Sequence, residues 1–122
     1  MQKIGVISQE IIDLLKLNIA ANTPIYIGVS NIEHMKNRHA YEYEKYFDNI
    51  SDINADPDYV GITPKDNSIQ YVKEYCVSSE YIRVAVRISQ SGKCFARTLH
   101  LLSTYNAENY IKKGTLKKLD KK

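Results

Sequence analysis

The feature that most constrains the fold is a change in the spacing of apolar residues near residue 60. Before this point, apolar side chains recur every three or four residues, which is the spacing of one helix face. After it, apolar and polar residues alternate in stretches rich in β-branched and aromatic residues, which is typical of strands. Helices followed by strands close together in sequence indicate an α+β fold with helices packed on an antiparallel sheet.

Two helices are predicted in the first half of the chain. Ser8 is followed by an acidic first turn and by apolar residues at helical spacing, which predicts a helix over about residues 8–17. Ser30 and Glu33 match a capping box, in which each side chain satisfies a free backbone donor of the other. Because no Pro or Gly interrupts the residues that follow, a second helix is expected over residues 31–47.

Strands dominate the second half. They are expected to form an antiparallel meander over residues 68–75, 81–88 and 94–102. Gly92 marks the turn before the last of them. Elsewhere, residues 25–29 are predicted to be extended, and residues 48–57 to form a loop or a weak helical turn. A short helix is expected from Thr104 until Gly114 ends it.

The length of 122 residues suits one domain, so residues 1–122 are expected to fold as a unit with a basic tail over about residues 115–122. No apolar run approaches the roughly 20 residues of a membrane span. The N-terminus also lacks the apolar stretch of a signal peptide, so we expect a cytoplasmic protein with no membrane partner. Cys76 and Cys94 lie in no cluster of metal-ligand spacing and are expected to be free thiols.

Charge is distributed unevenly along the chain. Residues 1–82 carry seven Lys or Arg and twelve Asp or Glu, a balance of −5, whereas residues 83–122 carry ten and two, a balance of +8. Such asymmetry can form a surface that attracts phosphate. A solvated tail explains six of the ten basic residues, all of them Lys near the C-terminus. The other four lie in or beside the predicted strands: Arg83, Arg87, Lys93 and Arg97.

The predicted strand 81–88 has one apolar and one cationic face, because successive side chains point to opposite sides. Burial favours placing Val84 and Val86 against the helices, which leaves Arg83 and Arg87 on the open face of the sheet. That face is either a solvated surface or a platform for phosphate.

The register of strand 94–102 is not determined by the sequence. The open face receives either Arg97 or the pair Thr98 and His100 from this strand.

The predicted helix 31–47 carries His34, Arg38 and His39. At about 100° per residue, His34 and Arg38 share a face, whereas the two histidines point roughly 140° apart. His39 lies on the apolar stripe, where a hydrogen-bonded core histidine is the ordinary explanation, and His34 would ordinarily be a surface histidine. A catalytic role for either has to be weighed against these explanations.

Cleavage of RNA by internal transesterification needs a base for the 2′-hydroxyl, an acid for the leaving 5′-oxygen and cations for the charge of the transition state. Histidine suits the first two roles because its pKa lies near neutrality. Arginine and lysine suit the third. This chemistry needs no metal ion, and the sequence contains no metal-ligand cluster and no phosphate-binding glycine loop, so no metal or cofactor is expected.

Several short motifs occur in a familiar order over about residues 4–116. They are Ile25-Tyr26-Ile27 with Ser30, the run from Glu33 to His39, the run from Asp56 to Tyr59, Ile69 with Tyr71 and Lys73, the run from Val84 to Arg87, and Ala96-Arg97-Thr98. This pattern resembles the phage and prophage branch of the barnase, EndoU, colicin and RelE-like nuclease superfamily.

The resemblance implies N-terminal helices packed on a twisted antiparallel sheet whose open face binds RNA. It implies a metal-independent, toxin-like endoribonuclease, with RNA as its partner and an antitoxin or immunity protein as a second candidate partner. Members use a helix or loop histidine, basic strand residues and a late hydroxyl, so the candidate catalytic residues are His39, His34, Lys73, Arg87 and Thr98. The candidate RNA-binding residues are Arg38, Arg83 and Arg97.

Two alternatives need no catalytic histidine. One is an accessory domain that binds nucleic acid or a host protein through the same arginines. The other is a protein whose apolar helix stripe serves only an oligomer interface.

Overall fold

The alternating residues of the second half form the predicted meander. In the computed structural model, which describes residues 1–121, strands β4 (Ile69–Tyr75), β5 (Glu80–Ile88) and β6 (Cys94–Leu102) pair in antiparallel order. Val84 and Val86 are fully buried, as predicted from the alternation. The local period of the sequence therefore defines both the strands and their inward face.

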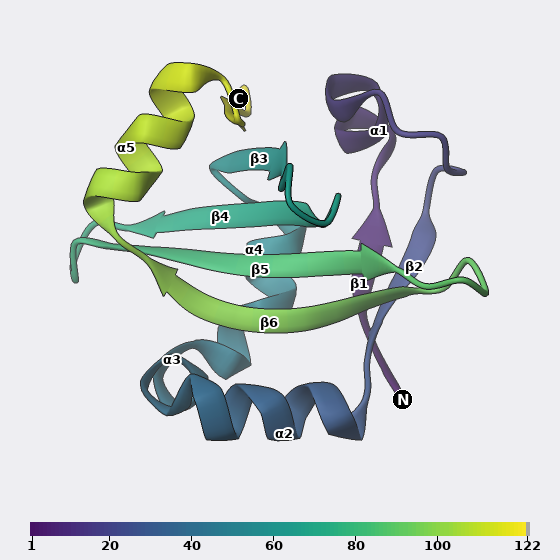
Figure 1. Cartoon of the computed structure of the whole chain (residues 1–122), viewed down its shortest axis with the longest axis horizontal. Coiled ribbons are helices and arrows are strands. Elements are labelled where there is room, and N and C mark those ends of the chain that lie inside the picture. Colours follow the sequence, from purple (N-terminus) through teal and green to yellow (C-terminus); the bar gives the residue numbers. More distant parts are fainter. Residues whose placement is uncertain (122) are drawn as a thin grey trace.

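Four further strands extend this meander on both sides. The sheet has the order β1-β2-β6-β5-β4-β3-β7, and all its neighbours pair antiparallel except β2 and β6. The added strands are β1 (Gln2–Ile7), β2 (Thr23–Ile27), β3 (Tyr59–Ile62) and β7 (Leu116–Lys118). β1 and β2 run at a steep angle to β4–β6 (Figure 1). The expected α+β class, with helices packed on a mostly antiparallel sheet, is thus confirmed.

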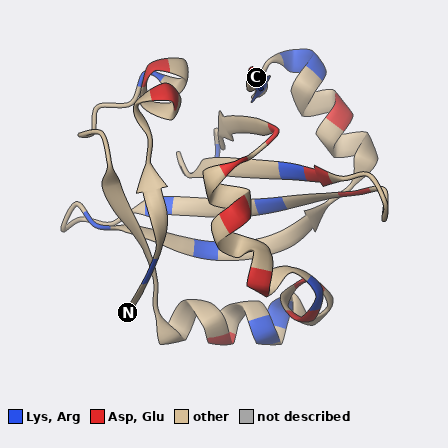
Figure 2. Ribbon diagram, turned by 180° about the vertical axis from the view of Figure 1, so that it is seen from behind, with Lys and Arg blue, Asp and Glu red and all other residues tan. Residues whose placement is uncertain are grey.

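The segment expected as a basic tail contains β7. Lys117 and Lys118 take part in pairing with β3, while Leu116 and Leu119 are buried. Most basic residues of the last third of the chain are consequently spread over β5, β6, β7 and the end of α5 (Thr104–Lys113), as Figure 2 shows for the strands and the helix.

The first helix begins at the predicted cap but ends at Leu15, earlier than expected, and the last helix ends at the predicted glycine. Helix α1 (Gln9–Leu15) is capped by Ser8, whose hydroxyl accepts a hydrogen bond from the amide of Ile11 at 3.3 Å. Helix α5 ends at Gly114, which has a φ of 82°.

The predicted helix 31–47 is instead two helices, α2 (Val29–Arg38) and α3 (Ala40–Tyr46), separated at His39. His39 has φ −137° and ψ 52°, outside the helical region. The capping box also differs from the prediction, because the amide of Gly28 donates to the Oδ1 atom of Asn31 at 2.9 Å.

Tertiary contacts account for the break between α2 and α3. Tyr41, Lys45 and Tyr46 of α3 all hydrogen-bond the carboxylate of Glu80 at the start of β5. At the break α3 leaves the line of α2 (Figure 1), and its hydrogen bonds to Glu80 hold it in this direction. The segment after it, expected as a loop or weak turn, forms a 3₁₀ turn (Phe47–Asn49) and helix α4 (Ile50–Ala55).

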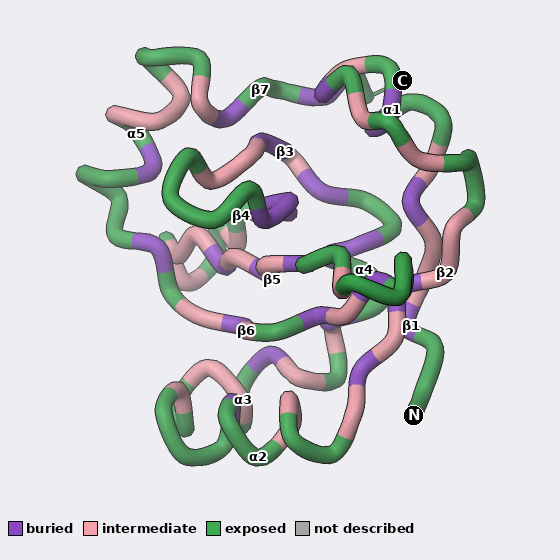
Figure 3. The backbone as a smooth tube through the Cα atoms, turned by 45° about the vertical axis from the view of Figure 1, so that its right-hand side comes forward, coloured by how far each residue is buried: buried purple, intermediate pink, exposed green. Residues whose placement is uncertain are grey.

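The two faces of the sheet are covered unequally. On one face, β4–β6 pack against α4 and the buried Tyr46 of α3, forming the main core. On the other face, α5 covers only the end that carries Val72 and Leu102. The rest of that face has no helix in front of it (Figure 1). Along β5 and β6, partly buried and exposed residues alternate with buried ones (Figure 3), and the partly buried Arg83 and Ala85 of β5 belong to this face. This open part of the sheet is bordered by α2, which packs along β6.

No helix within residues 1–121 is long and apolar enough to span a membrane. Cys76 is exposed and Cys94 is buried, and the two are unpaired.

Candidate functional site

A β-bulge in β6 determines which side chains reach the open face. The pairing of β5 with β6 shifts between Ala85 and Val86, which leaves Arg97 as the extra residue. Phe95 and Thr98 would point to opposite sides of a regular strand, but the bulge places both on the open face. The sequence left open whether Arg97 or Thr98 would be on this face, and the bulge brings both of them to it.

A cavity of about 330 Å³, here called the histidine pocket, lies between α2 and the open face. It combines an imidazole, a guanidinium, a carboxylate and several hydroxyl groups from segments far apart in the sequence. Its lining residues are Ser30, Asn31, His34, Asp66, Ser68, Ala85, Arg97 and Thr98. The pKa of Asp66 is lowered, first by the backbone hydrogen bond that Ser68 donates to it, and Arg87 and Arg97 contribute further.

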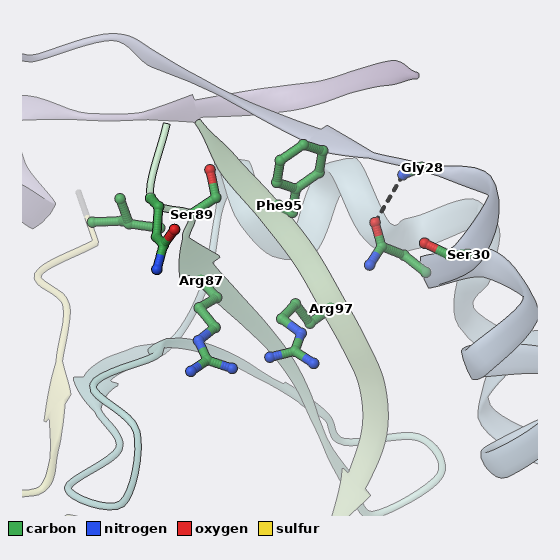
Figure 4. Close-up of a pocket in the computed structure, with 9 residues that line it drawn as sticks. Gly28, Ser30, Arg87, Ser89, Phe95 and Arg97 are labelled. Atoms are coloured by element: carbon green, nitrogen blue, oxygen red, sulfur yellow. Dashed lines mark hydrogen bonds between the residues drawn. The ribbon is translucent and has the colours of Figure 1, made fainter. Parts of the chain in front are cut away.

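A second cavity of about 480 Å³, the Phe95 pocket, continues from the first. The two share Ser30, Asn31 and Arg97, so together they form one groove along the start of α2. The remaining residues of the Phe95 pocket are Gly28, Arg87, Ile88, Ser89, Gln90 and Phe95. Figure 4 shows Arg87 and Arg97 projecting side by side from the two neighbouring strands.

His100 contacts both Thr98, which lines the histidine pocket, and Arg83 on the neighbouring strand β5. Its Nε2 atom accepts a hydrogen bond from Nε of Arg83 at 3.0 Å, and Arg83 also donates to Gln70 at 2.8 Å. Because Nε2 is an acceptor, the neutral ring carries its proton on Nδ1, which lies 3.2 Å from Oγ1 of Thr98. Burial, together with the nearby charges of Arg83 and His39, lowers the pKa of His100 to about 3. Thr98 therefore accepts from His100 and keeps its own hydroxyl hydrogen for another acceptor.

The break at His39 brings three histidines together. The ring of His39 stacks on that of His100, with centroids 5.1 Å apart. The ring of His34 lies edge-on to the ring of His39, with centroids 5.8 Å apart. Nδ1 of His39 is 3.8 Å from a carboxylate oxygen of Glu42, which also accepts the backbone N–H of Leu101 at 2.8 Å. The divergence of about 140° expected for an unbroken helix does not apply, because the chain leaves the helical conformation at His39.

The structure assembles some of the predicted site residues and separates others. His34, Arg97 and Thr98 line the histidine pocket, and Arg87 lines the adjoining Phe95 pocket. His39 lies next to His34 with its side chain 28% exposed, but it lines neither cavity. Arg38 is exposed at the end of α2 and lines neither cavity.

Two of the predictions for strand residues need correction. Lys73 pairs with Ile82, and so lies on the face opposite to Arg83; its Nζ contacts the backbone oxygen and the carboxylate of Asp56 at 2.7 and 3.3 Å. Arg83 is on the predicted face, but it is partly buried and its guanidinium donates a hydrogen bond to His100. It is therefore not free to bind a phosphate. Burial also lowers the pKa of Arg83.

His100 was not selected from the sequence, although alternation places it on the same face as Thr98 two residues earlier. Its role depends on the pairing of Arg83 with His100 across β5 and β6, which local sequence patterns do not specify. Within residues 1–121 there is no group of three His, Cys, Asp or Glu side chains placed to hold a metal ion.

The fold and the groove together define a class of small α+β domains that present basic, hydroxyl and imidazole groups on the open face of an antiparallel sheet. A family model described as phage-Barnase-EndoU-ColicinE5/D-RelE like nuclease3 matches residues 2–120, and the chain belongs to this family. No curated protein and no solved structure matches the chain significantly.

Proposed function

We propose that this protein is an endoribonuclease that cleaves RNA by attack of the 2′-hydroxyl on the adjacent phosphate, without a metal ion. The observation that carries the proposal is the convergence of His34, Arg97 and Thr98 on one cavity. An acid–base group, a cation and a hydroxyl donor are the three kinds of group that this reaction uses. Membership in a family of nuclease-like proteins supports the same class of reaction.

Arg97 and Thr98 are assigned to the scissile phosphate. A guanidinium can donate two parallel hydrogen bonds to phosphate oxygens, and its charge offsets the charge that the transition state gains. The hydroxyl hydrogen of Thr98 is available to a non-bridging oxygen because the oxygen of Thr98 already accepts from His100. Arg87, exposed on the neighbouring strand, is assigned to the next phosphate along the chain.

His34 and His39 are assigned to proton transfer. His34 lines the pocket and takes the proton of the 2′-hydroxyl as the 2′-oxygen forms its bond to phosphorus. The bond from phosphorus to the 5′-oxygen then breaks, and the 5′-oxygen receives a proton from His39. Glu42, 3.8 Å from Nδ1 of His39, is the charge partner for the protonated ring. The products are a 2′,3′-cyclic phosphate and a 5′-hydroxyl.

The experiment that tests this function incubates the purified protein with total RNA in EDTA and identifies the ends of the products. Cleavage that yields 2′,3′-cyclic phosphate and 5′-hydroxyl ends in EDTA is expected. Products with 5′-phosphate ends, or cleavage abolished by EDTA, would contradict the mechanism.

A second candidate function is binding of RNA without cleavage. It is favoured by one observation, that Arg87 and Arg97 form no ion pair with any carboxylate of residues 1–121. Two free guanidinium groups side by side serve a binding surface as well as a catalytic one. RNA that binds to the groove but is never cut would support this candidate.

A further inference from the structure

We infer that the Phe95 pocket is a nucleobase subsite, in which one unpaired base of an RNA strand stacks on the ring of Phe95 beside the scissile phosphate. The inference rests on the proposed function, because it names the part of the substrate that the adjoining cavity takes. The cavity of about 480 Å³ falls in the roughly 300–1,000 Å³ range of small-ligand sites.

The first argument is the apolar surface of this cavity. Phe95 lies on the open face, and its ring is supported by the ring of Tyr26 on the adjacent strand β2, with centroids 6.4 Å apart. Ile88, which is 44% exposed, adds a second apolar side chain to the lining. Figure 4 shows the Phe95 ring between the turn at Ser89 and the start of α2 at Gly28 and Ser30. A supported aromatic ring at the surface offers the flat face on which any base can stack.

The second argument is the hydrogen-bonding capacity of the pocket. Asn31 uses its Oδ1 atom to accept from the amide of Gly28, and this bond holds the side chain in place. Its Nδ2 atom donates to no group among residues 1–121, so both amide hydrogens are available to the cavity. The hydroxyl of Ser30 lines the same cavity. These donors suit the ring nitrogens and carbonyl oxygens at the edge of a base.

The third argument is charge and position. Arg87 and Arg97 both line the Phe95 pocket, and no Asp or Glu does. The occupant should therefore carry negative charge beside its flat, apolar part, as a nucleotide does. Because Arg97, Ser30 and Asn31 also line the histidine pocket, a base on Phe95 belongs to a nucleotide that adjoins the phosphate held by Arg97.

The test separates stacking from electrostatic attraction. One probe is a fluorescent single-stranded 2′-deoxy oligonucleotide of mixed sequence; the other is the same backbone with every base replaced by an abasic tetrahydrofuran residue. Neither has a 2′-hydroxyl, so neither can undergo the proposed cleavage, and binding is measured at one fixed salt concentration by anisotropy. The wild type is expected to bind the strand with bases about 5- to 150-fold more tightly, the range that corresponds to roughly 1–3 kcal/mol of stacking on one aromatic side chain.

Variants of the pocket locate the effect. Phe95→Leu should abolish most of the difference between the two strands, whereas Phe95→Tyr should keep it because the ring is retained. Arg87→Gln, the matched control, should weaken binding of both strands by the same factor. Ile88→Ser should reduce the difference, and as a change at an exposed residue it leaves the fold intact even if the Phe95 variants lower the Tm.

Equal affinity of the wild type for the two strands, failure to bind either strand, or a full difference in both Phe95→Leu and Ile88→Ser would overturn the inference. RNA cleavage by the wild type is measured separately. Cleavage without a preference for bases in the binding assay removes the subsite and leaves the nuclease proposal standing. A preference for bases that depends on Phe95, without cleavage, supports the subsite and counts against the nuclease.

Discussion

The Nδ1 atom of His100 lies 3.2 Å from the hydroxyl oxygen of Thr98, while Arg83 occupies the opposite ring nitrogen of the same histidine. This arrangement predicts that His100 acts through Thr98. His100→Phe retains a ring that can stack on His39 but removes the donor, so it should lower kcat about 10-fold, the effect of roughly one hydrogen bond. Thr98→Val should do the same, and the double variant should be no slower than either single one.

Kinetics of the four proteins at a temperature where all are folded check this prediction. Nitrogen NMR of wild-type His100 gives a second readout and should find the proton on Nδ1. A double variant that multiplies the two losses, or a proton on Nε2, would contradict the positioning role. Unfolding must be measured in parallel, because removing His100 leaves the partly buried Arg83 with one hydrogen-bond partner fewer.

His34 is expected to be the most sensitive position for chemistry. His34→Ala should reduce the cleavage rate by roughly 10²–10⁴-fold, the usual contribution of a general acid or base. Binding of a 2′-deoxy oligonucleotide should stay nearly unchanged, because the imidazole is assigned to proton transfer rather than to affinity. His39→Ala should also slow cleavage, by a smaller factor, since this ring lies outside the pocket lining.

Arg38→Ala is the matched control for His34→Ala, because Arg38 is exposed one turn further along α2 and lines neither cavity. Its cleavage rate should equal that of the wild type. If cleavage by an active preparation is unaffected by either histidine substitution, the acid–base assignment is wrong.

Arg97 and Lys73 should differ in their effect on RNA affinity, because they lie in different parts of the molecule. Arg97→Gln should weaken binding of a single strand and reduce the slope of log K against log salt by about 0.7, the value for one phosphate contact. Lys73→Gln should leave both quantities unchanged, since Lys73 is on the other face and is paired with Asp56. A larger effect from Lys73→Gln than from Arg97→Gln would place the RNA on the wrong side of the sheet for this proposal.

Glu80 should make stability depend on pH in the acidic range. Hydrogen bonds from Tyr46, Lys45 and Tyr41 lower the pKa of Glu80 from 4.5 to about 2. A carboxylate with a lowered pKa in the folded state stabilises the fold above the unfolded pKa, and this contribution is lost as pH falls from about 4.5 to about 2. Urea unfolding at a series of pH values should show a weaker decline over this window for Glu80→Gln than for the wild type. Parallel declines in the two proteins would show that Glu80 does not contribute.

Local sequence patterns were sufficient to predict those elements whose structure depends on residues close by in the chain. Alternation defined the meander and the burial of Val84 and Val86, because side chains two apart in a strand must share a face. Alternation also implied that Lys73 shares the face of Tyr71, which is buried; the family resemblance suggested a site role that this geometry does not support.

Three strands were not predicted from the sequence: β1 at one edge of the sheet, and the paired strands β3 and β7 at the other end. β3 and β7 have four and three residues, too few for alternation to identify, and β7 forms because its backbone pairs with β3 while Leu116 is buried. The capping box at Ser30 was likewise wrong, since the neighbouring Asn31 makes the competing bond to Gly28.

The sequence by itself determined the α+β class, the inward face of β5 and the presence of arginines opposite to it, because all of these follow from periodicity and from the cost of burying charge. Only the tertiary structure decided how the site is assembled. The bulge at Arg97 depends on the pairing of β6 with β5, and the break at His39 on the contacts of α3 with Glu80. Both are set by partners far away in the chain. They bring Arg97 and Thr98 to the groove that His34 also lines, and they place the ring of His39 against that of His34.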